Sequence, residues 1–175
     1  METAILWVKA QARHLRIDPQ RIALLGESAG GHLVAEAAVR PRDDTRVAAV
    51  VPFFAPVDLE SDTERRGGLS ASLQGLFGRT ELDETARALL REASPIRHVH
   101  AGLPPFLLVH GTADMSVPYE QSPRFQKELR AAGVSCDLVT VPDGTHGTSR
   151  WDELAPGWPD EVVAWIAKAL RRPGS

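Results

Sequence analysis

Residues 22–31 read IALLGESAGG, a short apolar run followed directly by a glycine-rich turn, and they are the most informative stretch of the sequence. The apolar run at 22–25 predicts a buried strand, because it is short and bounded by turn residues. The mostly apolar residues after the turn predict a helix that ends near Val39, before Pro41. A buried strand that leads straight into a helix is the repeating unit of α/β folds with a parallel sheet.

The same alternation continues on both sides of this unit. A helix is predicted over about residues 3–15, ahead of the first strand. Further buried strands are predicted at 47–53, 105–109 and 136–141, and further helices at 119–132 and 159–170. We therefore assign the chain to the α/β class, with three layers in which helices flank a mostly parallel sheet.

Residues 56–97 interrupt this alternation. They contain Gly67 and Gly68, scattered charge and short helical patches near 71–76 and 84–92. We interpret residues 1–175 as a single domain, and residues 56–97 as an excursion from the sheet that is able to form a cap.

Composition argues against several classes of function. Of 175 residues, 43% are hydrophobic and 25% are charged, as in an ordinary soluble domain rather than a disordered chain. The net charge of -3 and the lack of a basic stripe argue against binding to nucleic acid or to an anionic membrane surface. The single cysteine, Cys136, excludes an internal disulfide and a multi-cysteine metal site.

Targeting and cofactor signals are also lacking in the sequence. No apolar run approaches the roughly 18 residues that span a bilayer, and the opening METAILW does not resemble a secretory signal. We therefore expect a cytoplasmic protein. The histidines have no metal-ligand spacing with one another or with acidic residues, so no metal and no cofactor is predicted.

Residues 26–30, Gly-Glu-Ser-Ala-Gly, match the G-x-S-x-G pattern at the junction of strand and helix that this pattern requires. Such a turn holds Ser28 at a sharp apex with its hydroxyl in open space. Glycines on both sides allow the backbones of strand and helix to approach closely. The backbone N–H of Ala29, at the start of the helix, would donate to an oxyanion. The alternative is an accidental glycine-rich turn.

A nucleophilic serine requires a base, and the base requires an acid that orients it. Asp114 follows the strand predicted at 105–109, and His146 follows the strand predicted at 136–141. The carboxyl ends of parallel strands meet at one edge of the sheet, where substrates bind in such folds. We therefore predict a catalytic triad of Ser28 as nucleophile, Asp114 as acid and His146 as base.

Each member of this triad has an alternative interpretation. Asp114 could simply form a turn, and His146 could be a solvated loop residue. Asp143 is a competing acid, although it precedes His146 closely in the same loop and is interpreted as a loop residue. His110, at the end of a predicted strand, is expected to hydrogen-bond locally.

These residues resemble the α/β-hydrolase superfamily, in particular bacterial carboxylesterases of the hormone-sensitive-lipase-like and ferulic-acid-esterase-like groups. The matching stretches are residues 7–22, 26–32, 94–96, 104–114 and 144–147. The resemblance implies the same three catalytic residues in a serine carboxylesterase that hydrolyses small acyl esters through an acyl-enzyme intermediate. A peptidase or amidase is a lesser alternative, because the residues around Ser28 are more similar to these esterases.

The chain departs from that family at its start. Family members open with several further strands and a His-Gly-Gly-Gly-type loop that supplies part of the oxyanion hole, and this sequence has no such segment. We expect a shortened, N-terminally incomplete α/β-hydrolase fold in which Ala29 N–H is one donor and the second is missing. The loss of one oxyanion-hole donor typically lowers kcat by a factor on the order of 10²–10³. The alternative function is a catalytically weak or inactive hydrolase-fold fragment that acts by binding or needs a partner subunit.

Without those strands, the predicted strand at 22–25 would have one unpaired, apolar edge, and such edges favour pairing with another chain. We expect either a homo-oligomer formed through this edge or poor stability. The sequence is either a fragment of a longer enzyme or a short form completed by oligomerisation, and both interpretations stay open. Glu27 and Trp151 are candidate substrate contacts beside the triad, with ordinary packing as the alternative for Trp151.

Overall fold

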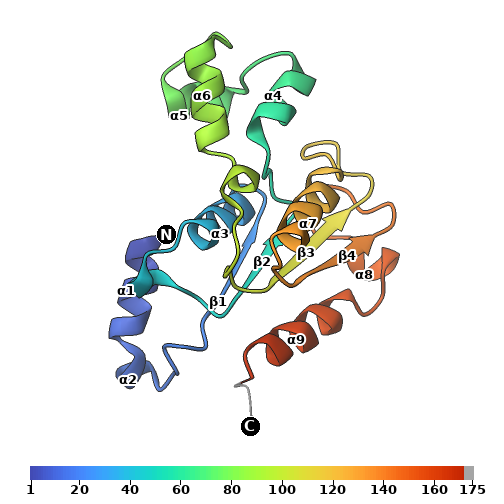
Figure 1. Cartoon of the computed structure of the whole chain (residues 1–175). Coiled ribbons are helices and arrows are strands. Elements are labelled where there is room, and N and C mark those ends of the chain that lie inside the picture. The colour runs from blue at the N-terminus through green and yellow to red at the C-terminus, as the bar shows by residue number, and fades with distance from the viewer. Residues whose placement is uncertain (172–175) are drawn as a thin grey trace.

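The computed structural model describes residues 1–171, and these contain one four-stranded sheet. The strands are β1 (Ala23–Glu27), β2 (Ala49–Phe53), β3 (Phe106–Gly111) and β4 (Cys136–Val141). They lie in the order β1-β2-β3-β4, and each neighbouring pair is parallel. The carboxyl ends of the strands therefore meet along one edge of the sheet (Figure 1).

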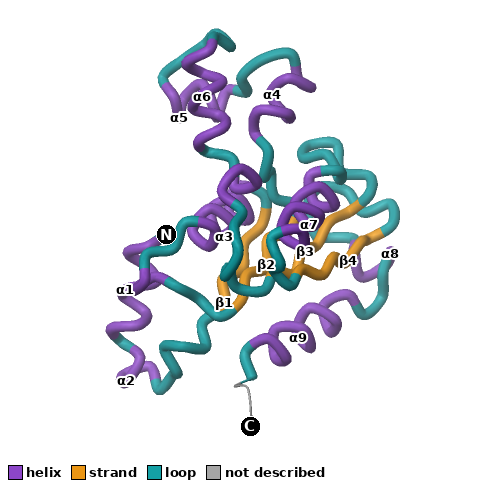
Figure 2. The backbone as a smooth tube through the Cα atoms, viewed as in Figure 1, coloured by secondary structure: helices purple, strands orange, loops and turns teal. Residues whose placement is uncertain are grey.

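Helices connect these strands and also precede and follow them (Figure 2). The α-helices are α1 (Glu2–Ala10), α2 (Ala12–Leu15), α3 (Ala29–Val39), α4 (Leu59–Arg66), α5 (Ala71–Phe77), α6 (Glu84–Glu92), α7 (Gln121–Ala131), α8 (Trp151–Leu154) and α9 (Trp158–Ala169). Short 3-10 turns, η1 (Asp43–Thr45) and η2 (Pro95–His98), precede β2 and β3. In the described part of the chain, no helix combines the length and apolar character needed to cross a membrane.

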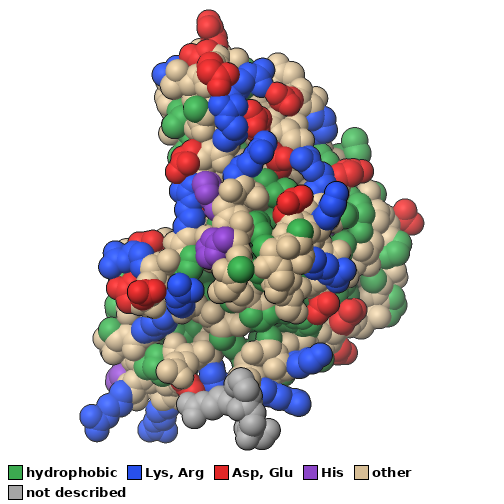
Figure 3. Space-filling view, in the orientation of Figure 1, with side chains coloured by type: hydrophobic (Ala, Val, Ile, Leu, Met, Phe, Trp, Pro, Cys, Tyr) green, Lys and Arg blue, Asp and Glu red, His purple; other side chains and the backbone are tan. Residues whose placement is uncertain are grey.

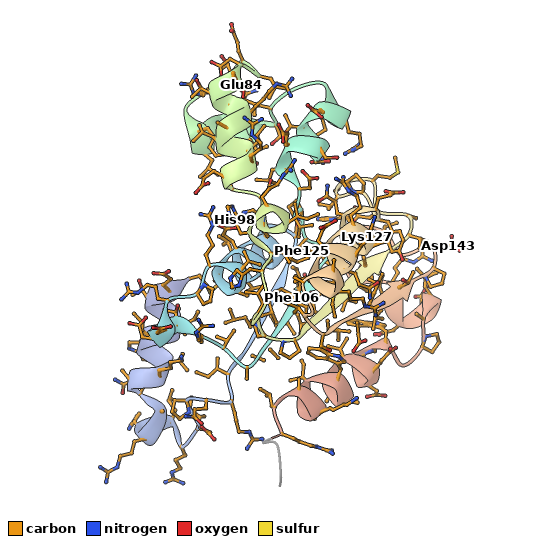
Figure 4. The ribbon with its side chains drawn as sticks, in the orientation of Figure 1. Glu84, His98, Phe106, Phe125, Lys127 and Asp143 are labelled. Atoms are coloured by element: carbon orange, nitrogen blue, oxygen red, sulfur yellow. The ribbon has the colours of Figure 1, made fainter. Side chains whose placement is uncertain are left out.

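Two apolar layers cover the two faces of the sheet. On one face α3 and α7 pack against the strands, and Phe106 of β3 meets Phe125 of α7 with ring centroids 5.6 Å apart (Figure 4). On the other face lie α9 and the fully buried Trp151 of α8. Successive strand residues serve opposite faces, so Leu108 packs in the first layer and Leu107 in the second. This arrangement confirms the predicted α/β class.

The predicted elements occur in the expected order but differ in extent. The strand at 136–141 has the predicted bounds. The helix predicted over 3–15 is two helices, because Gln11 adopts turn-like backbone angles of φ -89° and ψ 5° between α1 and α2. The strand predicted at 22–25 runs on to Glu27, since pairing with β2 rather than apolar character decides where it ends.

Residues 56–97 contain α4, α5 and α6, which extend away from the sheet and are called here the helical projection (Figure 1). Side chains of Asp58, Ser70 and Asp83 cap the three helices by accepting backbone N–H groups of their first turns. Buried leucines, among them Leu69 and Leu90, join the helices in a small core of their own. Basic and acidic side chains alternate over the outer surface of the projection (Figure 3).

Helix α4 was not predicted from the sequence. Its residues, LESDTERR, show no apolar periodicity, which is the main sequence signal for a helix. The signals at its ends were present, however: Asp58 is a favourable N-cap residue, and Gly67 ends the helix with a φ of 75°. Terminal signals alone can therefore mark a helix whose apolar face is small.

The outer edge of β1 faces no other strand within residues 1–171, because β1 pairs with β2 alone. Leu25 in this strand is 53% exposed, a large fraction for a leucine in a sheet. The expected pairing of a second copy along this edge stays a prediction. Sedimentation velocity over a range of concentrations measures it: we expect a dimer that dissociates when Leu25→Lys is introduced, because a charged edge disfavours pairing. A monomer at every concentration that is also stable to heat would contradict both the expected oligomer and the alternative of poor stability.

Cys136 at the start of β4 is buried among apolar side chains. Burial raises the pKa of its thiol to about 12, because the thiolate loses its hydration. A rise from 9.0 lowers the thiolate population at pH 8 by about 10³-fold. We therefore expect Ellman's reagent to modify Cys136 slowly in the native protein and rapidly in guanidinium chloride. Equal rates in both conditions would show that this thiol is accessible and ionised in the folded chain.

Candidate active site

Ser28 occupies the turn between β1 and α3 with φ 50° and ψ -119°, a backbone conformation that non-glycine residues rarely adopt. Its N–H donates to the carbonyl of Phe53 at the end of β2 (3.0 Å). Its own carbonyl accepts from the N–H of His32 in the first turn of α3 (2.9 Å). The turn is therefore held from both sides at the edge where the strands end.

Two glycines make room for this turn. A Cβ on Gly26 would lie 2.3 Å from the carbonyl oxygen of Gly30, and a Cβ on Gly31 would lie 2.9 Å from the carbonyl oxygen of Phe53. A Cβ on Gly30 would meet nothing within 4 Å. The expected role of glycines on both sides of Ser28 is therefore confirmed for Gly26 and wrong for Gly30. Gly31, one residue further on, allows the close approach of the helix.

Gly26→Ala is expected to lower the free energy of unfolding by about 3 kcal/mol, because the new methyl group would overlap backbone atoms of the helix. Gly30→Ala is the matched control. It is expected to leave stability unchanged or to raise it by up to about 1 kcal/mol, since alanine favours a helix and the space is open. Urea unfolding followed by circular dichroism measures both variants, and equal destabilisation would contradict this account of the turn.

His146 joins Ser28 to Asp114. Its Nδ1 lies 2.7 Å from Asp114 Oδ2, and its Nε2 lies 2.9 Å from Ser28 Oγ. An ionised carboxylate only accepts hydrogen bonds, so Nδ1 carries the proton and Nε2 of the neutral ring accepts from the serine hydroxyl. The structure thus brings together the three side chains selected from the sequence. They come from the turn after β1, the loop after β3 and the loop after β4.

The Asp114 carboxylate is fully buried and held by hydrogen bonds. Its Oδ1 accepts the backbone N–H groups of Ser116 (2.8 Å) and Val117 (2.9 Å), which leaves Oδ2 for His146. Asp143, the competing acid, is exposed in the outer loop with φ 56° (Figure 4), and no interaction within residues 1–171 joins it to His146. The geometry therefore favours Asp114 over Asp143 as the partner of the histidine.

Aromatic packing supports the histidine from within the core. The ring of Phe54 meets the His146 ring edge-on at 4.7 Å and the Trp151 ring at 5.5 Å. Trp151 is fully buried and donates its indole N–H to the carbonyl of Thr145 (3.2 Å). The interpretation of Trp151 as a substrate contact is therefore wrong, because a side chain without exposed surface cannot reach a ligand. Trp151 instead packs beneath the loop that carries His146, and Phe54 was not selected from the sequence because nothing there distinguishes it from a core residue.

A pocket of about 380 Å³ opens beside Ser28 and His146. Ala29, Ser116 and Val117 form the wall on the side of the sheet. The helical projection contributes Leu59, Asp62, Arg66, Ser70, Ser72, Leu73 and Leu76. Glu27, the other candidate substrate contact, is exposed at the end of β1 and is not among the lining residues.

Ala29 begins α3 and lies in the pocket wall next to Ser28. Across residues 1–171, its backbone N–H finds no protein acceptor. This N–H lies at the positive end of the helix dipole, so it is available to donate to a negatively charged oxygen bound next to Ser28. In the same described range, no group of three or more His, Cys, Asp or Glu side chains is placed to hold a metal ion.

Comparison with curated proteins finds esterases. The chain is 35% identical over 143 residues to the probable carboxylic ester hydrolase LipM of Mycobacterium tuberculosis. The aligned region covers 74% of this chain and 32% of LipM. It is 31% identical to esterase LipC of the same organism, over 98% of the chain and 46% of LipC. The chain thus spans 32% to 46% of the length of these relatives.

The solved structures that resemble this chain are also esterases. A truncated carbohydrate esterase from gut microbiota has a TM-score of 0.83 and 27% identity, over 98% of this chain and 67% of that one. The esterase Est2 of Thermogutta terrifontis has a TM-score of 0.74 and 31% identity, over 99% of this chain and 64% of that one. The BD-FAE family model matches residues 1–129, most of the chain. This chain is therefore a member of the BD-FAE family and has the fold of the α/β-hydrolase esterases.

Proposed function

We propose that this chain carries the activity of a serine carboxylesterase that hydrolyses small acyl esters through an acyl-enzyme intermediate. The observation that carries the proposal is the continuous series of contacts from Asp114 through His146 to Ser28, which ends at the pocket. A module that only binds a ligand has no physical need for these three side chains in this order. The esterase relatives support the same class of reaction.

In the acylation step, Ser28 Oγ attacks the ester carbonyl carbon while His146 Nε2 takes the hydroxyl proton. The electron pair of the C=O bond moves onto the carbonyl oxygen, and the Ala29 N–H donates to that oxyanion. The buried Asp114 carboxylate stabilises the imidazolium. When the tetrahedral intermediate collapses, the bond to the alcohol oxygen breaks and His146 returns its proton to that oxygen.

Deacylation repeats these steps with water. His146 Nε2 takes a proton from the water as its oxygen attacks the acyl carbon, and then gives that proton to Ser28 Oγ as the acyl bond breaks. The products are a carboxylic acid and the free enzyme. The partial exposure of the His146 side chain allows water to reach it from the pocket.

The pocket supports a small acyl or alcohol group as substrate. Its size suits a ligand of modest volume. Leu59, Leu73 and Val117 supply apolar surface for a short chain, and the serines of the helical projection supply hydroxyl groups. One structure of the T. terrifontis esterase is described as butyrate bound, which supports short acyl chains in this fold.

The test is hydrolysis of 4-nitrophenyl acetate and 4-nitrophenyl butyrate by the 175-residue chain, with the Ser28→Ala variant assayed beside it. We expect turnover that depends on Ser28 and covalent labelling of Ser28 by a fluorophosphonate. A folded chain without Ser28-dependent turnover would overturn the proposal and favour a weak or inactive hydrolase fold that acts by binding or with a partner subunit. Faster release of 4-nitroaniline from an acyl anilide than of nitrophenol from the ester would favour an amidase.

A further inference from the structure

His110 is a buried titratable residue that the mechanism above does not use. It belongs to β3, four positions before Asp114, and its side chain has no exposed surface. Its ring contacts two aromatic rings edge-on, with centroid distances of 6.5 Å to Phe54 and 5.6 Å to Tyr119. The expectation of local hydrogen bonds is confirmed, since both ring nitrogens are bonded close by in the chain.

The hydrogen bonds of His110 determine its tautomer. Nε2 lies 3.1 Å from the carbonyl oxygen of Val117, which can only accept, so Nε2 carries a proton. Burial lowers the pKa of His110 more than the nearby Asp114 carboxylate raises it, so the ring is neutral near pH 7. Nδ1 is therefore bare, and it accepts the hydroxyl proton of Ser122 at 2.7 Å.

The Nε2–H of His110 hydrogen-bonds to the Val117 carbonyl, and Nε2 also lies 3.3 Å from Asp114 Oδ2 in a second, electrostatic contact. This is the oxygen that accepts from His146 Nδ1 at 2.7 Å. The two histidines therefore meet the same carboxylate oxygen, one from the pocket and one from the core. The N–H groups of Ser116 and Val117 fix Oδ1, so Oδ2 is placed between the hydrogen bond from His146 and the contact with His110.

We propose that His110 is a positioning residue: the positive end of its Nε2–H, 3.3 Å from Asp114 Oδ2, attracts that oxygen from the core side and favours the orientation that His146 requires. This inference rests on the proposed function and deepens it. A carboxylate fixed only through Oδ1 could rotate Oδ2 away from His146, and the His110 donor opposes that rotation. A neutral ring suits this place, because a second positive charge would disfavour the imidazolium that forms on His146. The Ser122 contact ties His110, and through it the Asp114 loop, to α7.

Two amide substitutions of different reach test the proposal. The amide nitrogen of Gln takes the place of Nε2 in His110→Gln, whereas that of Asn takes the place of Nδ1 in His110→Asn. We expect His110→Asn to lower kcat for 4-nitrophenyl butyrate by about 10- to 100-fold with KM unchanged, the range seen when an outer-shell partner of a metal-binding residue is lost. His110→Gln is expected to keep most of the wild-type kcat. Val134→Ala, in the core beside α7, controls for the effect of lost stability alone.

Equal kcat values for the Asn and Gln variants would overturn the proposal, whether both were high or both were low, because a purely structural role does not depend on the reach of the amide. A second readout is independent of turnover. The proton between His146 Nδ1 and Asp114 gives a strongly deshielded proton resonance, which we expect in the wild type and in His110→Gln and which should move or disappear in His110→Asn. Failure of the proposed function would appear as equal turnover by the wild type and Ser28→Ala, with this resonance still dependent on residue 110.

Discussion

Ser28→Ala is expected to lower kcat for ester hydrolysis by a factor on the order of 10⁶, since removal of a serine nucleophile alone has an effect of that size in hydrolases with this arrangement. The variant keeps the Cβ atom, so the unusual backbone angles of the turn and its two flanking hydrogen bonds are unaffected. Only the Oγ atom that lies 2.9 Å from His146 Nε2 is lost. Stopped-flow and steady-state release of 4-nitrophenol measure the change in rate.

The matched control for this substitution is Ser135→Ala, at an exposed serine in the turn before β4. Both variants are expected to unfold at the wild-type temperature in a circular dichroism melt, and only Ser28→Ala should lose turnover and fluorophosphonate labelling. Retention of wild-type turnover by a folded Ser28→Ala would exclude Ser28 as the nucleophile. It would also remove the reason for the strained turn.

Asp114→Asn is expected to lower kcat by about 10⁴-fold, the effect typical of this change in serine hydrolases. The Asn oxygen would accept the N–H groups of Ser116 and Val117 in place of Oδ1, so its NH₂ group would face His146. An NH₂ donor forces the neutral histidine to present a bare Nδ1 and a protonated Nε2. A protonated Nε2 cannot accept the proton of Ser28, and the rate therefore falls although the geometry is kept.

Asp143→Asn is the matched comparison, because Asp143 lies in the same loop as His146 and was the competing candidate for the acid. Its side chain is exposed and makes no contact with His146 within residues 1–171, so we expect wild-type kcat from this variant. Measured with 4-nitrophenyl butyrate, a fall in Asp143→Asn together with unchanged activity in Asp114→Asn would reverse the assignment of the acid.

The three residues of the candidate site could be predicted from the sequence, because all strands of a parallel sheet run in the same direction. The loops that follow these strands therefore lie at the same edge of the sheet. Ser28, Asp114 and His146 each follow an apolar run, and in a parallel sheet such positions share one edge. The sequence is misleading about Trp151, because chain order does not fix the direction of a side chain. Its place after His146 in the chain says nothing about whether its indole points into the pocket or into the core, and packing against Phe54 decides that. The same holds for Glu27: it is next to Ser28 in the sequence, but its side chain is not among those that line the pocket.

The alternation of strands and helices, the strained serine turn and the three candidate side chains could all be predicted from the amino-acid sequence. These features depend on local patterns of apolar residues, on glycine and on chain order. Three further features became visible in the folded chain alone: which glycines the helix packs against, how the helical projection lines the pocket, and that His110 and His146 approach the same oxygen of Asp114. These features depend on contacts between residues that local patterns cannot relate, since side-chain direction and close packing are set by the whole fold.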